Sequence, residues 1–346
     1  PNPYQESLYR QMREAGVRTH YLQERTPSGA LNLLLLPLEV MVLRVRGWRT
    51  LHLHWVYGFG WPGGAGRRWQ RRVAEAWFDI NLSLWRALGI DVYWTAHNAL
   101  PHEPVFADDL RARRRLGAAA RCVFVHQRET IDELRRLGVA IHRSEVVPMP
   151  AYLLAESKTR QVSPPHAGLR LLFFGLIRPY KGVEVLLEAM GAVDPSLDVK
   201  LRVAGVCSSP ELSRNIADAV AADPRISVRL ERISDDELAD EIAAADFVVV
   251  PGTRITNSST VVMALGAGRP VVVSDIPAFA ALPELCAARF DGTVEDLASL
   301  IETLHDESSS QRSLRAEDAV KYAAGLPTWE EFAAGTLAVL SRSVGS

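Results

Sequence analysis

The sequence predicts an α/β protein made of two parallel sheets, each covered by helices on both faces. Short aliphatic runs alternate with longer stretches of helical periodicity along most of the chain. Parallel strands need a crossover connection, usually a helix, so this alternation favours doubly wound sheets. The length of 346 residues exceeds what one hydrophobic core usually serves, which indicates two domains.

The alternation is clearest in the second half of the chain. Strands are expected there at residues 169–174, 199–204, 226–230, 247–250 and 271–273. In the first half we expect strands at residues 50–55, 91–95 and 121–125 and helices at residues 4–15 and 129–137.

A polar segment separates the two halves. Residues 157–168 read SKTRQVSPPHAG, and the paired prolines continue neither a helix nor a strand. We therefore expect two Rossmann-like domains, at residues 1–160 and 169–326. Because open α/β sheets bind ligands at the carboxyl ends of their strands, the functional site is expected in a cleft between the domains.

Composition narrows the class of protein. A net charge of −2 gives no basic field for nucleic acid, so no nucleic-acid partner is expected. The cysteines, Cys122, Cys207 and Cys286, are far apart and in no metal-ligand spacing, which indicates a reducing compartment and buried thiols. No signal-peptide pattern opens the chain, so a cytoplasmic protein is expected.

The most hydrophobic stretch, residues 30–45, reads ALNLLLLPLEVMVLRV. Pro37, Glu39 and Arg44 interrupt it before the roughly 18 residues that a membrane span requires. We expect a buried helix there.

One segment predicts a site for a phosphorylated ligand. Residues 169–189 read LRLLFFGLIRPYKGVEVLLEA: an apolar strand, Gly175, a loop with Arg178 and Lys181, then Gly182 and an amphipathic helix. At such a strand-to-helix turn, backbone N–H groups, the helix dipole and two cations can converge on an anion. The plain alternative is that Gly175 only permits a tight turn.

Three runs resemble, in order, the donor-binding half of GT-B glycosyltransferases of the family-4-like clan. They are FFGLIRPYKGVEVLLEA, ERISDDELADEIAAADFVVVPG and ALGAGRPVVVSD. The first half agrees more loosely through NPYQESLYRQMREAG, HLHW, WTAHNALPHE and VVPMP. The closing TWEEFAAGTLAVL resembles the family's last helix, so residues 327–346 are expected to cross back onto the acceptor-binding first domain.

The resemblance implies a nucleotide-sugar donor in the second domain. Arg178 and Lys181 would hold its diphosphate and neutralise the leaving group, so neither a metal nor another cofactor is expected. Gly205 would lie close to the nucleoside, whose ribose Glu231 or Asp235 would meet. A second helix N-terminus is expected to offer capping side chains to the donor at Asn257, Ser258, Ser259 and Thr260.

The chain departs from the family at one point. Retaining members commonly carry two glutamates separated by seven residues, and the corresponding positions here are Ile255 and Met263. Apolar side chains cannot stabilise an oxocarbenium-like charge. Three explanations stay open: an inverting enzyme with its base in the first domain, a retaining enzyme with other groups, or a domain that binds without catalysis.

We favour inversion, with the base within WTAHNALPHE. His97 follows an expected strand end, and His102 and Glu103 lie one short loop later. Each can instead be structural, through a core hydrogen bond or a turn cap. GT-B enzymes that form β-mannosidic linkages in bacterial polysaccharides look similar here, so GDP-mannose is the first expected donor, ahead of a UDP-sugar.

The acceptor side is expected near His54 and Trp55. His52 and His54 point to one face of a strand, an acceptable metal geometry without an evident third ligand. In the helical stretch 66–88 an apolar face and clustered arginines suit a lipid-linked acceptor at a membrane surface, although a core helix with a solvated basic face is favoured.

The function expected is therefore transfer of a hexosyl unit from a nucleoside-diphosphate sugar to a hydroxyl of a glycan, glycolipid or small molecule. A nucleotide-sugar epimerase on the same fold and a non-catalytic sugar-nucleotide-binding subunit are the alternatives. The protein is expected in the cytoplasm. Within it, a peripheral position at the inner face of the membrane is a further expectation.

Overall fold

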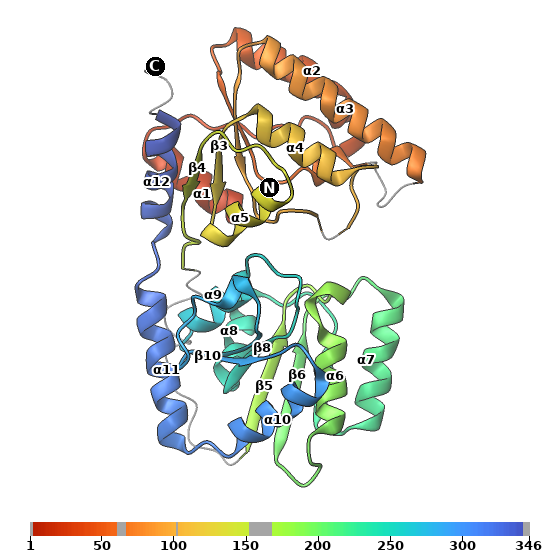
Figure 1. The fold of residues 1–346 in the computed structure, drawn as a ribbon, viewed down its shortest axis with the longest axis vertical. Helices are drawn as coiled ribbons and strands as arrows, with labels where there is room; N and C mark the ends of the chain where they lie inside the picture. The colour runs from red at the N-terminus through yellow and green to blue at the C-terminus, as the bar shows by residue number, and fades with distance from the viewer. Residues whose placement is uncertain (1–2, 61–66, 102, 152–167, 342–346) are drawn as a thin grey trace. The chain divides into compact units, whose positions relative to one another are not determined.

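The computed structural model describes residues 3–60, 67–101, 103–151 and 168–341, and the chain divides into two compact units. Unit 1 consists of Pro1–Met149 with Thr328–Ser346, and unit 2 is Pro150–Pro327 (Figure 1). Apart from Gly168, the polar segment expected between the domains lies outside the described residues.

Unit 1 contains a parallel four-stranded sheet in chain order. Its strands are β1 (Thr50–Leu53), β2 (Asp91–Thr95), β3 (Ala120–Val125) and β4 (Ser144–Val146). The three strands expected from the sequence are confirmed, although β1 ends two residues early, and β4 was not expected.

Helices cover both faces of this sheet. Alternate residues of β2 separate the faces: Val92 and Trp94 belong to one apolar cluster, and Tyr93 belongs to another with Val339. The second face is covered by α1 and α12, which pack on each other through a cluster that includes Leu8 and Phe332. The helices of unit 1 are α1 (Pro3–Glu14), α2 (Gly29–Val45), α3 (Arg68–Ala87), α4 (Asp109–Ala119), α5 (Arg128–Arg136) and α12 (Trp329–Ser341).

Helix α2 lies beside α3, and a proline explains one of the bonds between them (Figure 1). Pro37 lies inside α2 and has no N–H to donate to the Leu33 carbonyl one turn earlier. The indole Nε1–H of Trp77 on α3 donates to that carbonyl instead, at 3.1 Å. Arg44 Nε donates to the Leu88 carbonyl at 2.7 Å, so the two helices run parallel.

The expectation that residues 30–45 form a buried helix is half right. The helix is present, but only four of its residues are buried, among them Glu39, which accepts a hydrogen bond from Arg25 Nε at 2.9 Å. The opposite side of α2 exposes its apolar residues to solvent, because α3 and the sheet cover only one side of the helix. We call these residues the α2 stripe: Leu31, Leu34, Leu38, Met41 and Val45.

Unit 2 contains a parallel six-stranded sheet in the order β10-β9-β8-β5-β6-β7. The chain moves from β5 through β6 to β7, returns to the other side of β5, and continues through β8 and β9 to β10. The order therefore reverses between β5 and β8, where doubly wound sheets bind ligands. The strands are β5 (Leu169–Phe174), β6 (Val199–Ala204), β7 (Ile226–Arg229), β8 (Phe247–Val250), β9 (Val271–Ser274) and β10 (Ala287–Phe290).

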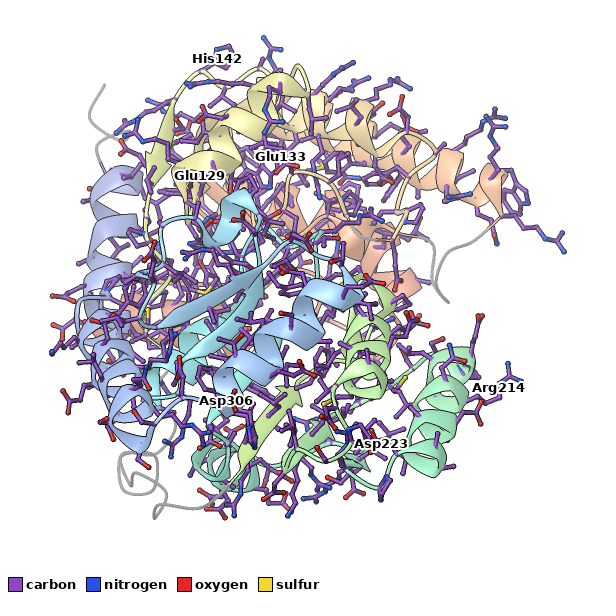
Figure 2. All side chains as sticks on the ribbon, turned by 60° about the horizontal axis from the view of Figure 1, so that its bottom comes forward. Glu129, Glu133, His142, Arg214, Asp223 and Asp306 are labelled. Carbon is purple, nitrogen blue, oxygen red and sulfur yellow. The ribbon has the colours of Figure 1, made fainter. Side chains whose placement is uncertain are left out.

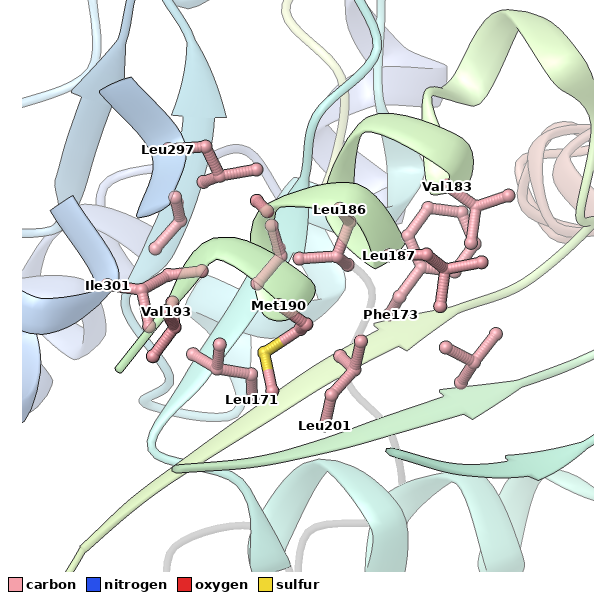
Figure 3. Close-up of a cluster of buried hydrophobic side chains, with 14 of the residues drawn as sticks. Leu171, Phe173, Val183, Leu186, Leu187, Met190, Val193, Leu201, Leu297 and Ile301 are labelled. Atoms are coloured by element: carbon pink, nitrogen blue, oxygen red, sulfur yellow. The ribbon is translucent and has the colours of Figure 1, made fainter. Parts of the chain in front are cut away.

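Strand β5 supplies both cores of unit 2. Leu171 and Phe173 face a cluster with α6 and α10, while Leu172 and Phe174 face the cluster of α8, α9 and α11. Figure 3 shows Leu186 and other residues of α6 packed over β5 and β6. Fully burying one such leucine stabilises the fold by about 1.5–3 kcal/mol. The helices of unit 2 are α6 (Val183–Ala192), α7 (Pro210–Ala222), α8 (Asp235–Ala244), α9 (Ser259–Gly266), α10 (Val294–His305) and α11 (Ser309–Ala324).

The outer sides of the helices are polar, as binary patterning requires. Figure 2 labels Glu129 on α5 and Arg214 on α7, which are exposed, whereas Leu134 and Ile216 of the same helices are buried. The predicted parallel α/β architecture is confirmed, and β10 is an additional edge strand that the sequence did not indicate.

Candidate functional site

Two glycines bring the ends of β5 and β6 together. Gly175 follows β5 with φ +105°, and Gly205 follows β6 with φ +139°. The Gly175 N–H donates to the Ala204 carbonyl at 3.0 Å. A Cβ on Gly205 would overlap the carbonyl group of Gly175, so only glycine permits this approach. The close approach of the two backbones therefore explains why position 205 is a glycine, independently of the nucleoside contact expected there.

The loop after β5 lies directly against the loop after β8. Gly182 has φ +76° and precedes α6, and a Cβ there would lie 2.9 Å from the Pro251 carbonyl oxygen. A Cβ on Gly252 would lie 2.7 Å from the Tyr180 carbonyl oxygen. The contact is therefore backbone to backbone, at the point where the strand order reverses.

Lys181 and Thr260 meet on the open side of Gly175. A Cβ built on Gly175 would lie 3.6 Å from Lys181 Nζ and 3.9 Å from Thr260 Oγ1. Thr260 is buried in the first turn of α9, so the positive end of this helix dipole also lies near Gly175. An ammonium, a hydroxyl and a helix N-terminus thus surround a space without a side chain.

The electrostatics of this space favour an anion. Burial, followed by the positive charge of Arg178, lowers the pKa of Lys181. Two cations held close together in a partly buried place destabilise each other, and a phosphate between them would remove that cost. Sequence reasoning selected both residues, and the structure brings them together.

The α9 N-terminus is held in place by two hydroxyl groups. Ser258 Oγ caps α9 by accepting a hydrogen bond from the Val261 N–H at 3.2 Å. Ser274 Oγ on β9 donates to the Pro251 carbonyl at 2.8 Å and fixes the preceding loop. Of the other two residues expected here, Asn257 is half-buried and Ser259 is exposed.

Ile255 and Met263, at the positions of the family's glutamates, are both partly buried against the apolar cluster that includes α9 and β8. A carboxylate in either place would lose hydration without an evident gain. The apolar residues therefore suit their surroundings.

A second set of polar residues lies at the carboxyl edge of the unit 1 sheet. His54 follows β1, His97 follows β2 and His126 follows β3, and all three are buried. His54 Nδ1 lies 3.3 Å from His97 Nε2, and the Tyr4 hydroxyl lies 3.3 Å from His126 Nε2. We call His54, His97 and His126 the histidine cluster. His126 was not identified from the sequence, although its position directly after an apolar strand was a usable signal.

The histidine cluster is neutral at physiological pH. Burial lowers the pKa of His126 to about 4 and lowers the pKa values of His54 and His97 well below the ordinary value. The Nδ1–H of His126 donates to the Val147 carbonyl at 2.9 Å, because a carbonyl can only accept, so His126 Nε2 accepts from the Tyr4 hydroxyl.

A chain of hydrogen bonds runs from Tyr9 to His97. The Tyr9 hydroxyl lies 2.9 Å from His54 Nε2, and His54 Nδ1 contacts His97 Nε2. This chain has two arrangements. In one, the Tyr9 hydroxyl donates to His54 Nε2 and His54 Nδ1–H donates to His97 Nε2, so Nδ1 of His97 carries the hydrogen. In the other, His97 Nε2–H donates to His54 Nδ1 and His54 Nε2–H donates to the Tyr9 oxygen, so Nδ1 of His97 has a lone pair. In the second arrangement His97 presents a lone pair at Nδ1, and a proton taken up there makes the chain of three groups positively charged by one.

The other residues expected in unit 1 are the acceptor-side residue Trp55 and the catalytic candidates His102 and Glu103. The Trp55 ring stacks on the His97 ring with centroids 4.2 Å apart and planes inclined by 9°, so His54 and Trp55 both contact His97. Glu103 is exposed, and His102 lies outside the described residues.

Of the two carboxylates expected to contact a ribose, one is bonded to an arginine. Glu231 accepts from Arg229 Nε at 2.6 Å, and Arg229 also donates to Glu237, which caps α8. Asp235, in the first turn of α8, is exposed. Glu231 therefore forms an ion pair with Arg229 in the structure.

The turn that holds Gly175, Arg178 and Lys181 lies within a segment that matches a known family. The model described as "Glycosyl transferases group 1" matches residues 168–307, which include all six strands of unit 2. This segment is a group 1 glycosyltransferase domain.

Curated proteins similar to this chain include bacterial glycosyltransferases. It is 35% identical over 243 residues to the GDP-mannose:glycolipid 4-beta-D-mannosyltransferase of Xanthomonas campestris pv. campestris, covering 68% of this chain and 64% of that protein. It is 27% identical over 181 residues to the D-inositol 3-phosphate glycosyltransferase of Corynebacterium efficiens, covering 49% of this chain and 42% of that protein. The chain thus spans less than two thirds of the length of these relatives.

Solved structures share the fold. Sucrose-phosphate synthase from Thermosynechococcus elongatus has a TM-score of 0.70 at 18% identity, over 90% of this chain and 78% of that one. Anabaena HepE in complex with UDP and glucose has a TM-score of 0.67 at 16% identity, over 89% of this chain and 82% of that one. Both confirm the GT-B fold class of this chain. In the described parts of the chain, no helix combines the length and the apolar character needed to cross a bilayer.

Proposed function

We propose that this protein transfers a hexosyl group from a nucleoside-diphosphate sugar to an acceptor hydroxyl. The observation that carries the proposal is the meeting of Lys181 Nζ and Thr260 Oγ1 at Gly175, beside the N-terminus of α9. The names of the relatives in Xanthomonas campestris support GDP-mannose as the donor and a glycolipid as the acceptor.

In this proposal Arg178 and Lys181 bind the diphosphate. When the bond between the anomeric carbon and the diphosphate oxygen breaks, negative charge develops on the leaving group. The two cations and the α9 N-terminus stabilise that charge, a role that typically changes the rate by about 100-fold or more for each group. The transfer then needs neither a bound metal nor another cofactor.

We further propose that the reaction inverts the anomeric centre. A β-linkage formed from an α-linked sugar nucleotide needs a base that takes the proton of the attacking acceptor hydroxyl. His97, His102 and Glu103 stay the predicted candidates. Support for His97 comes from its contact with His54: when His97 Nε2–H donates to His54 Nδ1, Nδ1 of His97 has the lone pair that takes the acceptor's proton, and His97 becomes an imidazolium. The apolar Ile255 and Met263 support a site without a retaining carboxylate.

The same apolar residues favour one second candidate, a subunit that binds the sugar nucleotide without turning it over. For either activity we propose a cytoplasmic protein that meets a lipid-linked acceptor at the inner membrane surface. The support is the glycolipid named for the relatives in Xanthomonas campestris.

Calorimetric titration with GDP and UDP, followed by incubation with GDP-mannose and a bacterial lipid extract, tests the proposal. Saturable binding with acceptor-dependent release of nucleotide supports a transferase. Binding without release supports the non-catalytic candidate, release of an isomerised donor without acceptor supports an epimerase, and no binding overturns the phosphate site. Lys181→Ala is expected to abolish binding, with the exposed Lys200→Ala as its matched control.

A further inference from the structure

Helix α2 presents a continuous apolar face to solvent. In the α2 stripe, Leu34 is 63% exposed, Leu38 58% and Val45 89%. The five residues of the stripe are spaced at intervals of three or four, so they form one row along the helix. Surfaces of this kind are uncommon on soluble proteins and mark a contact with another apolar phase.

The row continues onto α3. Val73 and Ile80 are 49% and 54% exposed and lie one turn before and one turn after Trp77. Because the Trp77 indole bonds to the Leu33 carbonyl, this side of α3 is the side next to α2. The two helices run parallel, so their exposed apolar residues form one surface, which we call the α2–α3 surface.

Arginines lie near the ends of the two helices that form this surface. Arg68 and Arg72 are exposed at the start of α3, with Trp69 53% exposed between them. Arg46 and Arg49 are exposed just after α2. Over residues 29–49 and 67–88 the sequence has eight arginines and three acidic residues, although the whole chain has a net charge of −2.

The three acidic residues do not offset this charge at the surface. Glu39 is buried and bonded to Arg25. Glu75 is buried and accepts from Arg111 at 2.9 Å, and Asp79 pairs with Arg115 at 2.9 Å. Arg68 and Arg72 lie on the α4 side of α3, where they line a pocket with Glu75, Asp79, Asp108 and Asp109. The positive charge at the α2 side of the surface therefore comes from Arg46 and Arg49, which are exposed.

We infer that the α2–α3 surface docks on the headgroup region of a bilayer that contains anionic lipid. The apolar row would enter the boundary of the acyl chains, and the arginines would contact phosphate groups, as interfacial amphipathic helices do. A second copy of the chain fits less well, because a two-fold contact through this surface would bring two sets of arginines together. The inference concerns unit 1 and does not depend on the donor site of unit 2.

Vesicle co-sedimentation with the full chain tests the inference. Phosphatidylcholine vesicles with 30% phosphatidylglycerol should bind the protein, while pure phosphatidylcholine vesicles and high salt should weaken binding. Leu34→Ser with Leu38→Ser should lower the partition coefficient about 100-fold, since each leucine accounts for about tenfold or more. Leu314→Ser, at a leucine of α11 that is 48% exposed, is the matched control and should bind like the unchanged chain.

Arg46→Glu with Arg49→Glu provides a second variant that leaves the apolar row intact. Its binding to anionic vesicles should fall at least about 20-fold. The inference is overturned if the unchanged chain ignores anionic vesicles, or if both double variants bind as well as the control. Dimerisation in sedimentation equilibrium that the leucine variant abolishes, without vesicle binding, would assign the surface to a second copy. Calorimetry with GDP on the same preparations separates these outcomes from failure of the donor site.

Discussion

Acidification should unfold unit 1 through its histidine cluster. The pKa of an unfolded histidine is about 6.5, whereas burial lowers the pKa of His126 to about 4. Between these values the unfolded chain binds more protons than the folded one. Stability is therefore fully present above pH 6.5 and falls as the pH drops toward 4.

The size of the effect follows from the shift. At pH 5, about 1.5 units below the unfolded pKa, His126 alone lowers the free energy of unfolding by about 2 kcal/mol. His54 and His97 are shifted in the same direction. The loss at pH 5 is therefore larger than the contribution of His126 alone, which is already a large fraction of the roughly 5–15 kcal/mol by which domains are stable.

Tryptophan fluorescence is a selective assay for this transition. All eight tryptophans of the sequence belong to unit 1, so the signal reports that unit alone. Urea unfolding at pH 7.5, 6 and 5 should show a steadily lower midpoint. His126→Asn should reduce the pH dependence by about one proton, because an amide retains hydrogen-bonding groups without titrating in this range. Equal unfolding free energies at pH 7.5 and 5 would refute the reasoning, as would an unchanged slope in the variant.

Three further substitutions test other parts of the structure. Lys181→Ala should lower kcat/KM with the sugar nucleotide about 100-fold or more, while the thermal midpoint without ligand stays the same or rises, because repulsion from Arg178 is removed; a lower midpoint would contradict the assigned repulsion. Gly205→Ala should destabilise unit 2 by at least about 2 kcal/mol in urea unfolding followed by circular dichroism, through overlap with Gly175 and strain at positive φ. Trp77→Phe should cost about 1–3 kcal/mol, measured by denaturant unfolding, because the Leu33 carbonyl loses its donor; a neutral result would show that water replaces the indole.

Most strands that the sequence predicted are rich in aliphatic or aromatic residues, either in a run, as in β8, or in alternation with polar residues, as in β6. Strands such as β5 and β8 are covered on both faces, and their sequences LRLLFF and FVVV are mostly aliphatic or aromatic. The two missed strands, β4 with SEV and β10 with AARF, lie at sheet edges and are short. Their pairing depends on a neighbouring strand rather than on their own pattern.

Burial and long-range contacts were harder to predict than local chemistry. Arg178 and Lys181 are close in sequence, so their turn could be recognised directly. The burial of α2 was predicted wrongly because hydrophobicity does not tell which side of a helix is covered. The position of His126 after an apolar strand was a usable signal, but its contact with Tyr4, 122 residues away, could not be read from the sequence. Only the order of the strands brings the three histidines to one edge.

The interlocked backbones of the loops after β5 and β8 also limit how this site can be redesigned. Gly182 lies against Pro251, and Gly252 lies against Tyr180, with no space for a side chain at either glycine. An insertion in one loop would force the other to move, so libraries that alter loop length here should yield few folded members. Variation intended to change the donor is better directed to side chains that leave these two glycines and the length between them unchanged.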